Sequence, residues 1–309
     1  MNAARWLPIL RWGKHYSRTE ATQDGIAALI VTLMLIPQSL AYAMLAGLPP
    51  VVGLYASILP LVAYGVFGTS QTLSVGPVAV VSLMTAAALG PLFASGSPEY
   101  MAAAGLLALL SGGMLLGMAV LRLGFLANFL SHPVISGFIS ASALVIAASQ
   151  LRHLLGIAGA GHTLPDILSS LIAHLPDIHG ATAILGSLCL LFLVFVRQYL
   201  KSVLIRLGLS ARLAGHLTKL GPVVAVLASI LAVQFLHLAD AGVAVVGNIP
   251  GGLPPLTWPM LDSALIIPLL PAAALISLVG FVESVSVAQT LAAKRRQRIE
   301  PDQELVGLG

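Results

Sequence analysis

The sequence predicts an all-α polytopic membrane protein with about eight spans. The 309 residues are 58% hydrophobic and only 8% charged, whereas an ordinary soluble domain is about 25% charged. Apolar runs also recur at the length of about 20 residues that a helix needs to cross a bilayer. The chain has too few charges to solvate a globule of 31.9 kDa, and it has one cysteine. This composition excludes a soluble domain, a nucleic-acid binder and a disulfide-rich secreted protein.

The predicted spans follow the apolar runs in chain order. They cover residues 25–46, 51–68, 77–90, 101–121, 133–151, 181–200, 219–238 and 264–292. The third run holds only 14 residues, from Pro77 to Gly90, so we expect a half-helix there in place of a full crossing. The eighth run is long, and we expect it to leave the membrane at Ala292–Ala293.

The basic residues support eight crossings with both ends in the cytoplasm. With the N-terminus inside, 14 of the 15 Lys and Arg residues fall on the cytoplasmic side, and Arg152 falls outside. The acidic residues on the outer side are Glu99, Asp166, Asp177, Asp240 and Asp262. This is the asymmetry that the positive-inside rule describes. We therefore predict a multi-pass protein of the cell inner membrane with a cytoplasmic N-terminus.

These spans divide the chain into three segments. Residues 1–24 form a predicted cytoplasmic segment, residues 25–293 a membrane domain, and residues 294–309 a cytoplasmic loop. The last segment joins the basic run Lys294–Arg298 to the polar stretch Ile299–Glu304. Because a polar loop does not complete a membrane domain, we interpret the sequence as a fragment.

Glycine and proline interrupt several spans. The chain has 30 glycines and 19 prolines, and Pro37, Pro268 and Pro271 lie within apolar runs. A broken helix in lipid must find partners for its freed backbone groups, which it does where it is buried in protein or lines a cavity. Interrupted helices in a packed bundle are typical of transporters.

The run Ser74-Val-Gly-Pro-Val-Ala-Val80 opens the short third span. Ser74 and Val75 suit an extended backbone. Gly76 lets a ligand approach the main chain closely, and Pro77 suits the first position of a helix. An extended segment followed by a half-helix would present free N–H groups and the positive end of the helix dipole to an anion. The alternative is an ordinary kinked helix.

Two further motifs place polar side chains inside spans. Gln38 and Tyr42 follow Pro37 and share a helix face because they are four residues apart. They either line a substrate site or make hydrogen bonds between helices. In the eighth span, Glu283 is an ionisable side chain deep in the membrane, a costly placement that indicates function. It would carry a proton or help to coordinate a cation, and the alternative is a structural acid bonded to a neighbouring half-helix.

The sequence indicates no enzyme, no metal site and no cofactor. No pair among the 8 histidines has the spacing of zinc ligands on a helix. Catalysis would need a cluster of titratable groups in a cleft, and one glutamate does not form such a cluster.

Ordered runs of residues carry a family resemblance. They are Pro37–Ala43, Gly47–Ser57, Phe67–Ser70, Leu73–Leu83, His132–Phe138, Ser149–Leu151, Val246–Pro254 and Gly280–Gln289. Across roughly residues 20–295, the sequence resembles the sulfate permease (SulP) family of anion transporters. Two positions depart from the family pattern. Val52 replaces a usual tyrosine, and Gln71 replaces a usual basic residue after Gly-Thr-Ser.

The resemblance implies a fold of two inverted repeats of seven spans each. The chain would hold the first repeat and the first helix of the second, without the family's second half-helix or its cytoplasmic STAS domain. Spans 1, 3 and 8 would belong to a moving core, and spans 5 to 7 to a more static gate. The substrate-binding residues implied by position are Gln38, Tyr42, Gly76, Pro77 and Val78. Glu283 would serve the coupling ion.

The predicted function is secondary active transport of an inorganic anion, with sulfate as the first candidate, by alternating access and coupled to protons or sodium ions. The alternatives are a bicarbonate or dicarboxylate transporter of the same family, an uncoupled anion channel, and a truncated product that does not transport. The expected partners are the small anion, the coupling ion, membrane lipid and a second copy of the chain in a homodimer.

Overall fold

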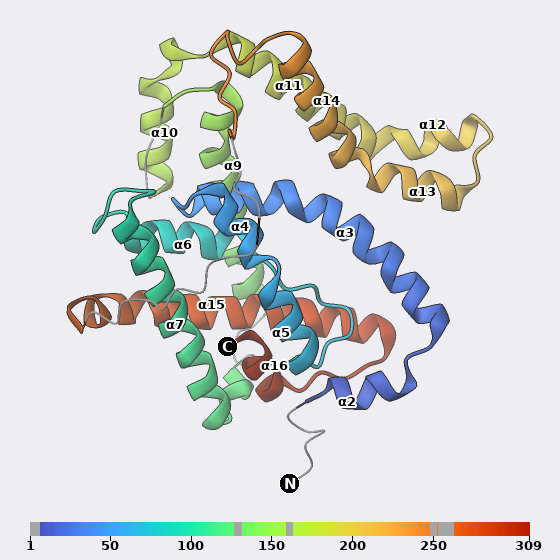
Figure 1. The fold of residues 1–309 in the computed structure, drawn as a ribbon, viewed down its shortest axis with the longest axis vertical. Helices are drawn as coiled ribbons and strands as arrows, with labels where there is room; N and C mark the ends of the chain where they lie inside the picture. The colour runs from blue at the N-terminus through green and yellow to red at the C-terminus, as the bar shows by residue number, and fades with distance from the viewer. Residues whose placement is uncertain (1–6, 127–131, 159–162, 248–251, 253–262) are drawn as a thin grey trace. The chain divides into compact units, whose positions relative to one another are not determined.

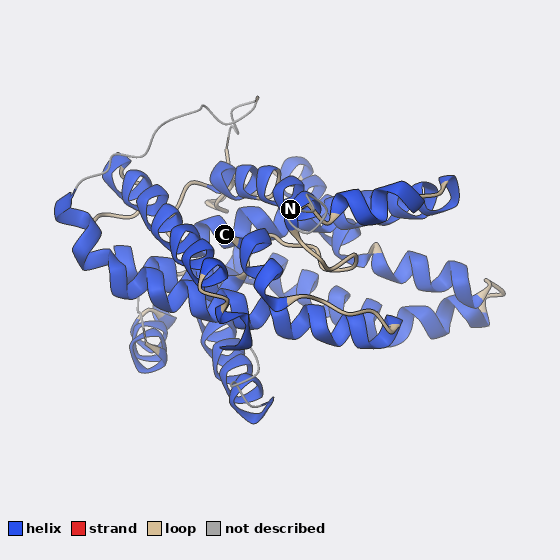
Figure 2. Ribbon diagram, turned by 90° about the horizontal axis from the view of Figure 1, so that it is seen from below, coloured by secondary structure: helices blue, strands red, loops and turns tan. Residues whose placement is uncertain are grey.

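The protein is helical throughout the residues that its computed structural model describes, and these contain no strand (Figure 1, Figure 2). The described residues are 7–126, 132–158, 163–247, 252 and 263–309. The predicted all-α fold is confirmed. Arg5, Asp262 and most of the run Val246–Pro254, which entered the sequence predictions, lie outside the described residues.

The helices follow one another with short connections. They are α2 (Ile9–Trp12), α3 (Arg18–Leu45), α4 (Pro50–Ala56), α5 (Leu59–Phe67), α6 (Ala79–Leu89), α7 (Pro98–Val120), α9 (His132–Leu155), α10 (Leu164–Ala173), α11 (Gly180–Phe195), α12 (Lys201–Arg206), α13 (Ala211–Lys219), α14 (Gly221–Phe235), α15 (Ser263–Arg295) and α16 (Pro301–Leu308). Several of these helices have a polar N-cap residue. Ser17 and Glu20 form a capping box at the start of α3, and Ser97 accepts a hydrogen bond from the backbone of Tyr100 in α7, as helix N-termini require.

Within the described residues, five helices are long and apolar enough to span a membrane, or six if one bent pair counts as a single span. The five are Arg18–Leu45, Pro50–Phe67, Pro98–Val120, Gly180–Arg206 and Ala264–Arg295, and the bent pair is Leu213–Lys219 with Gly221–Phe235. The predicted third and fifth spans correspond to α6 and α9. Their apolar parts among the described residues, Ala79–Leu89 and Ala143–Leu155, are shorter than a membrane-spanning helix. The chain is therefore a multi-pass membrane protein, and the number of eight crossings stays a prediction.

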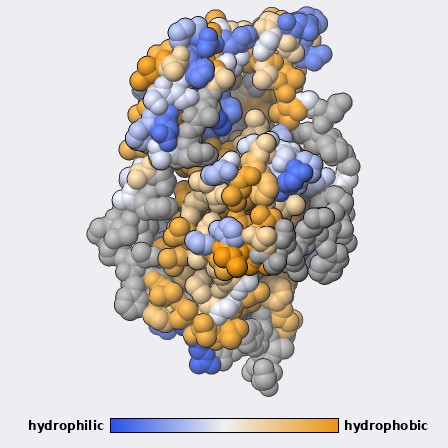
Figure 3. All heavy atoms as spheres, turned by 90° about the vertical axis from the view of Figure 1, so that its left-hand side faces the viewer, coloured by the Kyte–Doolittle hydropathy of each residue, from blue (hydrophilic) through white to orange (hydrophobic). Residues whose placement is uncertain are grey.

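Large apolar side chains cover much of the helix surfaces. In α11, Leu188 and Leu191 are 60% and 65% exposed, and in α14 Phe235 is 75% exposed. Figure 3 shows hydrophobic residues over much of one face of the molecule, with hydrophilic residues in smaller groups. A soluble monomer rarely exposes apolar surface on this scale, whereas lipid is a suitable solvent for it.

The chain divides into two compact units. Unit 1 comprises Met1–Ala21, Gln38–Ser140 and Ile249–Gly309, and unit 2 comprises Thr22–Pro37 and Ala141–Asn248. The boundary within α3 falls at Pro37, the proline inside that helix.

Unit 1 is built on the packing of α15 against α7 and α6, and Figure 1 shows α7 crossing α15. The buried residues of this core are Leu89, Tyr100, Ala103, Leu106, Leu107, Leu269, Ala273 and Ile276. The hydroxyl oxygens of Ser111 and Ser277 lie 3.0 Å apart where α7 meets α15. Small hydroxyl residues allow such close helix contacts and satisfy each other inside apolar surroundings.

A second close contact joins α3 to α4. The hydroxyl oxygens of Ser39 and Ser57 lie 2.6 Å apart, and Ser39 is fully buried. Gly53 makes this approach possible because a Cβ atom on it would lie 2.0 Å from the backbone oxygen of Ser39.

The segment expected as a loop over residues 294–309 contains helix α16. Pro301 occupies the first turn, a position that suits proline. Leu305 is fully buried in a cluster with Leu115, Phe281 and Val285. The helix packs against α5 and α7. Burial of Leu305 therefore orders a stretch whose polar composition suggested a loop. The cytoplasmic location of residues 294–309 stays a prediction.

Unit 2 packs α11 against α14 and α12 against α13. His179 caps α11 through its Nδ1 atom, which accepts a hydrogen bond from the backbone of Thr182. The Nε2 atom of the same ring lies 2.9 Å from the backbone oxygen of Ala241. This histidine therefore has a structural role within unit 2.

We expect Gly53→Ala to destabilise unit 1. The added Cβ atom would meet a backbone oxygen at 2.0 Å, and a backbone atom cannot rotate aside as a side chain can. Overpacking of this kind costs about 1–3 kcal/mol, so the unfolding midpoint of the purified full-length protein should fall. Gly65→Ala is the matched control, because a Cβ atom there meets nothing within 4 Å. Equal midpoints for the two variants would contradict the close contact of α3 and α4.

Candidate functional site

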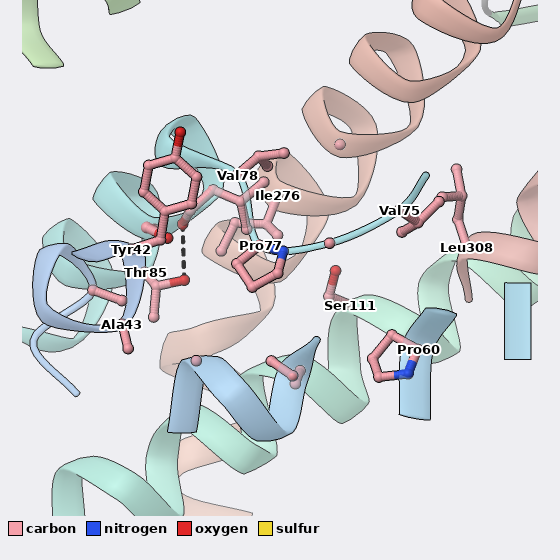
Figure 4. Close-up of a pocket in the computed structure, with 18 of the residues that line it drawn as sticks. Tyr42, Ala43, Pro60, Val75, Pro77, Val78, Thr85, Ser111, Ile276 and Leu308 are labelled. Carbon is pink, nitrogen blue, oxygen red and sulfur yellow. Dashed lines mark hydrogen bonds between the residues drawn. The ribbon is translucent and has the colours of Figure 1, made fainter. Parts of the chain in front are cut away.

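Unit 1 contains a cavity of about 720 Å³ that lies among segments far apart in the sequence. Its walls come from α3, α4, α5, α6, α7, α15, α16 and the stretch before α6. Figure 4 shows this cavity, with Pro77 and Val78 on the connecting stretch and Ile276 on α15. Among the described lining residues, none is Lys, Arg or His. Any negative charge that binds here must therefore be met by backbone groups, hydroxyls or helix dipoles.

One wall of the cavity is an extended segment, Leu73–Val78, and all six of its residues line the space. The predicted half-helix is present, but it begins at Ala79. The expectation that Pro77 is the first helical residue is therefore wrong. Val78 is the N-cap, with the extended φ of −122° and ψ of 142°, a conformation that a β-branched residue adopts readily.

The N-terminus of α6 is not capped by a side chain of its N-cap residue. Val78 has no polar side-chain atom, and its backbone oxygen accepts the first helical hydrogen bond from Ser82, at 3.0 Å. The first N–H groups of a helix have no partner inside the helix, and the positive end of the dipole lies there. Because Val78 and Val81 line the cavity, this end of α6 can bind an anion without a cationic side chain.

Gln38 and Tyr42, the two predicted site residues on α3, have different positions. Tyr42 lines the cavity, whereas Gln38 does not. The Gln38 Nε2 atom donates a hydrogen bond to the Tyr42 hydroxyl at 3.2 Å. Of the two residues, Tyr42 is the one at the cavity, and Gln38 bonds to its hydroxyl. This bond lies within α3, so it is not the hydrogen bond between helices that was the alternative for this pair.

Glu283 reaches the cavity from α15. Its Oε2 atom is buried and has no hydrogen-bond partner among the described residues. A buried carboxylate oxygen without a partner is costly, and most buried polar atoms in native proteins are paired. The hydrogen bond to a half-helix, which the structural alternative requires, is not made by this oxygen. Glu283 can therefore accept a proton or a cation from the cavity.

Sequence reasoning missed other residues that line the cavity. Thr85, Ser111 and Ser284 contribute hydroxyls from three helices, and Leu308 contributes an apolar side chain from α16. No local sequence pattern marks these residues, because each lies on a different stretch of ordinary apolar helix and only the packing of the helices brings them together. The Thr85 hydroxyl is already used within α6, where it donates to the Val81 oxygen at 2.9 Å.

The two departures from the SulP pattern lie in different places. Val52 lines the cavity, so the absent tyrosine removes a ring and a hydroxyl from its wall. Gln71 is exposed, and its side-chain oxygen accepts a hydrogen bond from Gln297 at 3.3 Å. The change at residue 71 therefore acts outside the cavity.

Comparison with known proteins gives one family. The model of the sulfate permease family matches residues 22–309. "Sulfate transporter 4.1, chloroplastic" of Arabidopsis thaliana is 39% identical over 308 residues, which cover 99% of this chain and 42% of the relative. "Probable sulfate transporter Rv1739c" of Mycobacterium tuberculosis is 37% identical over 313 residues, which cover 100% of this chain and 52% of the relative. The chain thus spans about half the length of the curated relatives it matches.

Two solved structures share the fold. SLC26A9 matches with a TM-score of 0.84 and 25% identity, over 99% of this chain and 49% of that chain. The transmembrane domain of the cyanobacterial bicarbonate transporter BicA matches with a TM-score of 0.75 and 20% identity, over 94% of this chain and 71% of that chain.

Tyr42→Phe is expected to weaken anion binding at the cavity. Loss of a hydrogen bond to a charged ligand reduces affinity by about tenfold, and phenylalanine preserves the packing of the ring. Radiolabelled sulfate binding to the purified full-length protein measures the change. Tyr55→Phe is the matched control, because Tyr55 lies on α4 outside the cavity lining. Equal affinities for the two variants would remove Tyr42 from the site.

Proposed function

Because the chain belongs to the sulfate permease family, we propose that the full-length protein carries an inorganic anion, sulfate, across the membrane by secondary active transport. The observation that carries this proposal is the N-terminus of α6, which faces a cavity without basic side chains. Backbone N–H groups and a helix dipole bind an anion strongly enough for recognition. They hold it without the full opposite charge that would slow its release.

Sulfate is the first candidate because both curated relatives described above are named as sulfate transporters. A dipole site recognises charge and size more than chemical identity. Bicarbonate and dicarboxylates are therefore competitors that the transport experiment must include.

The two compact units support alternating access as the mechanism. The half-helix α6 and the long helix α15 belong to unit 1, together with residues Gln38–Leu45 of α3. The helices of the predicted spans 6 and 7 belong to unit 2, and so does most of the predicted span 5. We assign the moving, anion-carrying core to unit 1 and the more static gate to unit 2. Compact units of this kind can move as bodies, as alternating access requires.

Glu283 is the proposed coupling residue. Its unpartnered oxygen lies at the same cavity as the end of α6. A proton or sodium ion on this carboxylate would lower the repulsion between two negative charges in one space. Cation binding would then favour anion binding, and the two would be transported together.

The remaining proposals concern the setting of the protein. We place it in the cell inner membrane with a cytoplasmic N-terminus, because the basic residues follow the positive-inside rule. A homodimer is the proposed assembly, by analogy with the family.

Uptake of radiolabelled sulfate tests the proposed function. The full-length reading frame would be expressed in cells that lack their own sulfate uptake, with unlabelled sulfate, bicarbonate and succinate as competitors. We expect saturable uptake that unlabelled sulfate blocks and the other two do not. Uptake that bicarbonate or succinate blocks instead would reassign the anion. Absence of uptake by a well-expressed, membrane-inserted protein would overturn the sulfate proposal, and a current that does not saturate would indicate a channel.

Glu283→Gln is expected to abolish the dependence of sulfate uptake on external pH. Glutamine keeps the shape of the side chain but cannot gain or lose a proton in this range. Uptake measured between pH 5 and pH 8, a range of about three units around neutrality, should become flat. Asp177→Asn is the control, because Asp177 is exposed and lies outside the cavity lining. Unchanged pH dependence in the Glu283 variant would remove this residue from coupling.

A further inference from the structure

A second acid of unit 1, Glu304, lies outside the cavity lining. It belongs to α16, and its side chain is fully buried. One carboxylate oxygen accepts the hydroxyl of Tyr64 at 2.6 Å. The other accepts the backbone N–H of Thr69 at 2.8 Å, the backbone N–H of Ser70 at 3.2 Å, and the Thr69 hydroxyl.

These four hydrogen bonds reach one short stretch of chain. Thr69 and Ser70 lie directly after Gly68, the C-cap of α5, and Tyr64 lies on the last turn of that helix. All four donors on this carboxylate are neutral, and hydrogen bonds to an ionised acceptor are shorter and stronger than those between neutral groups. Glu304 therefore holds the end of α5 and the first residues of the connection to α6.

Neighbouring contacts tighten the same junction. Gln303 donates its Nε2 hydrogen to the backbone oxygen of Phe67 at 2.8 Å, which satisfies a carbonyl at the end of α5. A Cβ atom on Gly307 would lie 3.0 Å from the Cα atom of Gly68. The backbone of α16 thus approaches the connection so closely that a side chain at residue 307 would press against the backbone of Gly68.

A continuous path links this junction to the cavity. The hydroxyl oxygen of Ser70 accepts the backbone N–H groups of Thr72 and Leu73, at 3.4 Å and 3.2 Å. Leu73 is the first residue of the extended segment that lines the cavity and leads into α6. On the other side, Leu308 lines the cavity one helical turn beyond Glu304.

We propose that Glu304 is a positioning residue that fixes the extended segment Leu73–Val78, and with it the N-terminus of α6, for anion binding. This inference rests on the proposed function. Glu304 does not touch the anion. It acts through Thr69 and Ser70, which set where the extended segment begins. A junction left without the carboxylate would keep its helices but would hold the binding backbone less firmly.

The positioning role can be measured without transport. In the full-length protein with Cys189 and any other native cysteine replaced, Ser74→Cys places a thiol on the exposed part of the extended segment. Its reaction rate with a charged maleimide reports how firmly the segment is held. We expect Glu304→Gln to raise this rate about tenfold, the factor that corresponds to the loss of one charge-assisted hydrogen bond. An unchanged rate would overturn the proposal.

Transport supplies the second measurement. In the protein with native cysteines, Glu304→Gln should raise the KM for sulfate by about tenfold while the maximal rate per inserted molecule falls much less. A residue needed only for folding would reduce the amount of inserted protein and leave KM unchanged, which would overturn the proposal. Glu300→Gln is the matched control, because Glu300 is an exposed acid on the same segment whose partner is the exposed Arg11. It should leave both KM and the labelling rate unchanged.

A second variant keeps the test decisive if Glu304→Gln does not fold. Tyr64→Phe removes one donor to the carboxylate and preserves the ring, so we expect a rise of about threefold in both labelling rate and KM. No rise in either quantity would overturn the proposal. If the wild-type protein carries no sulfate, the proposed function fails, whereas the labelling experiment still decides whether Glu304 holds the segment.

Discussion

The organisation of unit 1 depends on keeping a stretch of non-helical backbone inside a bundle of helices. An extended segment such as Leu73–Val78 cannot satisfy its N–H and C=O groups within itself, and lipid offers no partners. Such a segment is stable only where protein surrounds it or a cavity hydrates it. The crossing of α7 and α15, the close approach of α3 and α4, and the return of α16 all contribute to that enclosure.

Glu304, which is fully buried, and Glu283, which is half-buried, differ in how their carboxylate oxygens are hydrogen-bonded. Glu304 is surrounded by donors from three neighbouring residues. Glu283 leaves one buried oxygen without a partner among the described residues. A satisfied carboxylate is stable as it stands and holds its neighbours in place. An unsatisfied one remains available to a ligand, and its energetic cost is typical of a site kept for function.

The features that local sequence predicts are those that depend on short-range chemistry. The apolar runs, the short third span and the pairing of Gln38 with Tyr42 follow from helix length and helix period. The start of α6 was misplaced by two residues, because a proline suits several positions around a helix end and the N-cap geometry of Val78 decides among them. Helix α16 was expected as a loop, because its polar residues bond to partners more than 200 positions away, and no local pattern records such partners.

That separation has a consequence for how the chain is made. Tyr64 and Glu304 are 240 residues apart, so at the synthesis rate of about 5–20 residues per second the acid follows the tyrosine by about 10–50 s. During that interval the connection between α5 and α6 exists without the carboxylate that orders it. The proposed anion site is therefore completed late, when the residues of α16 have been synthesised.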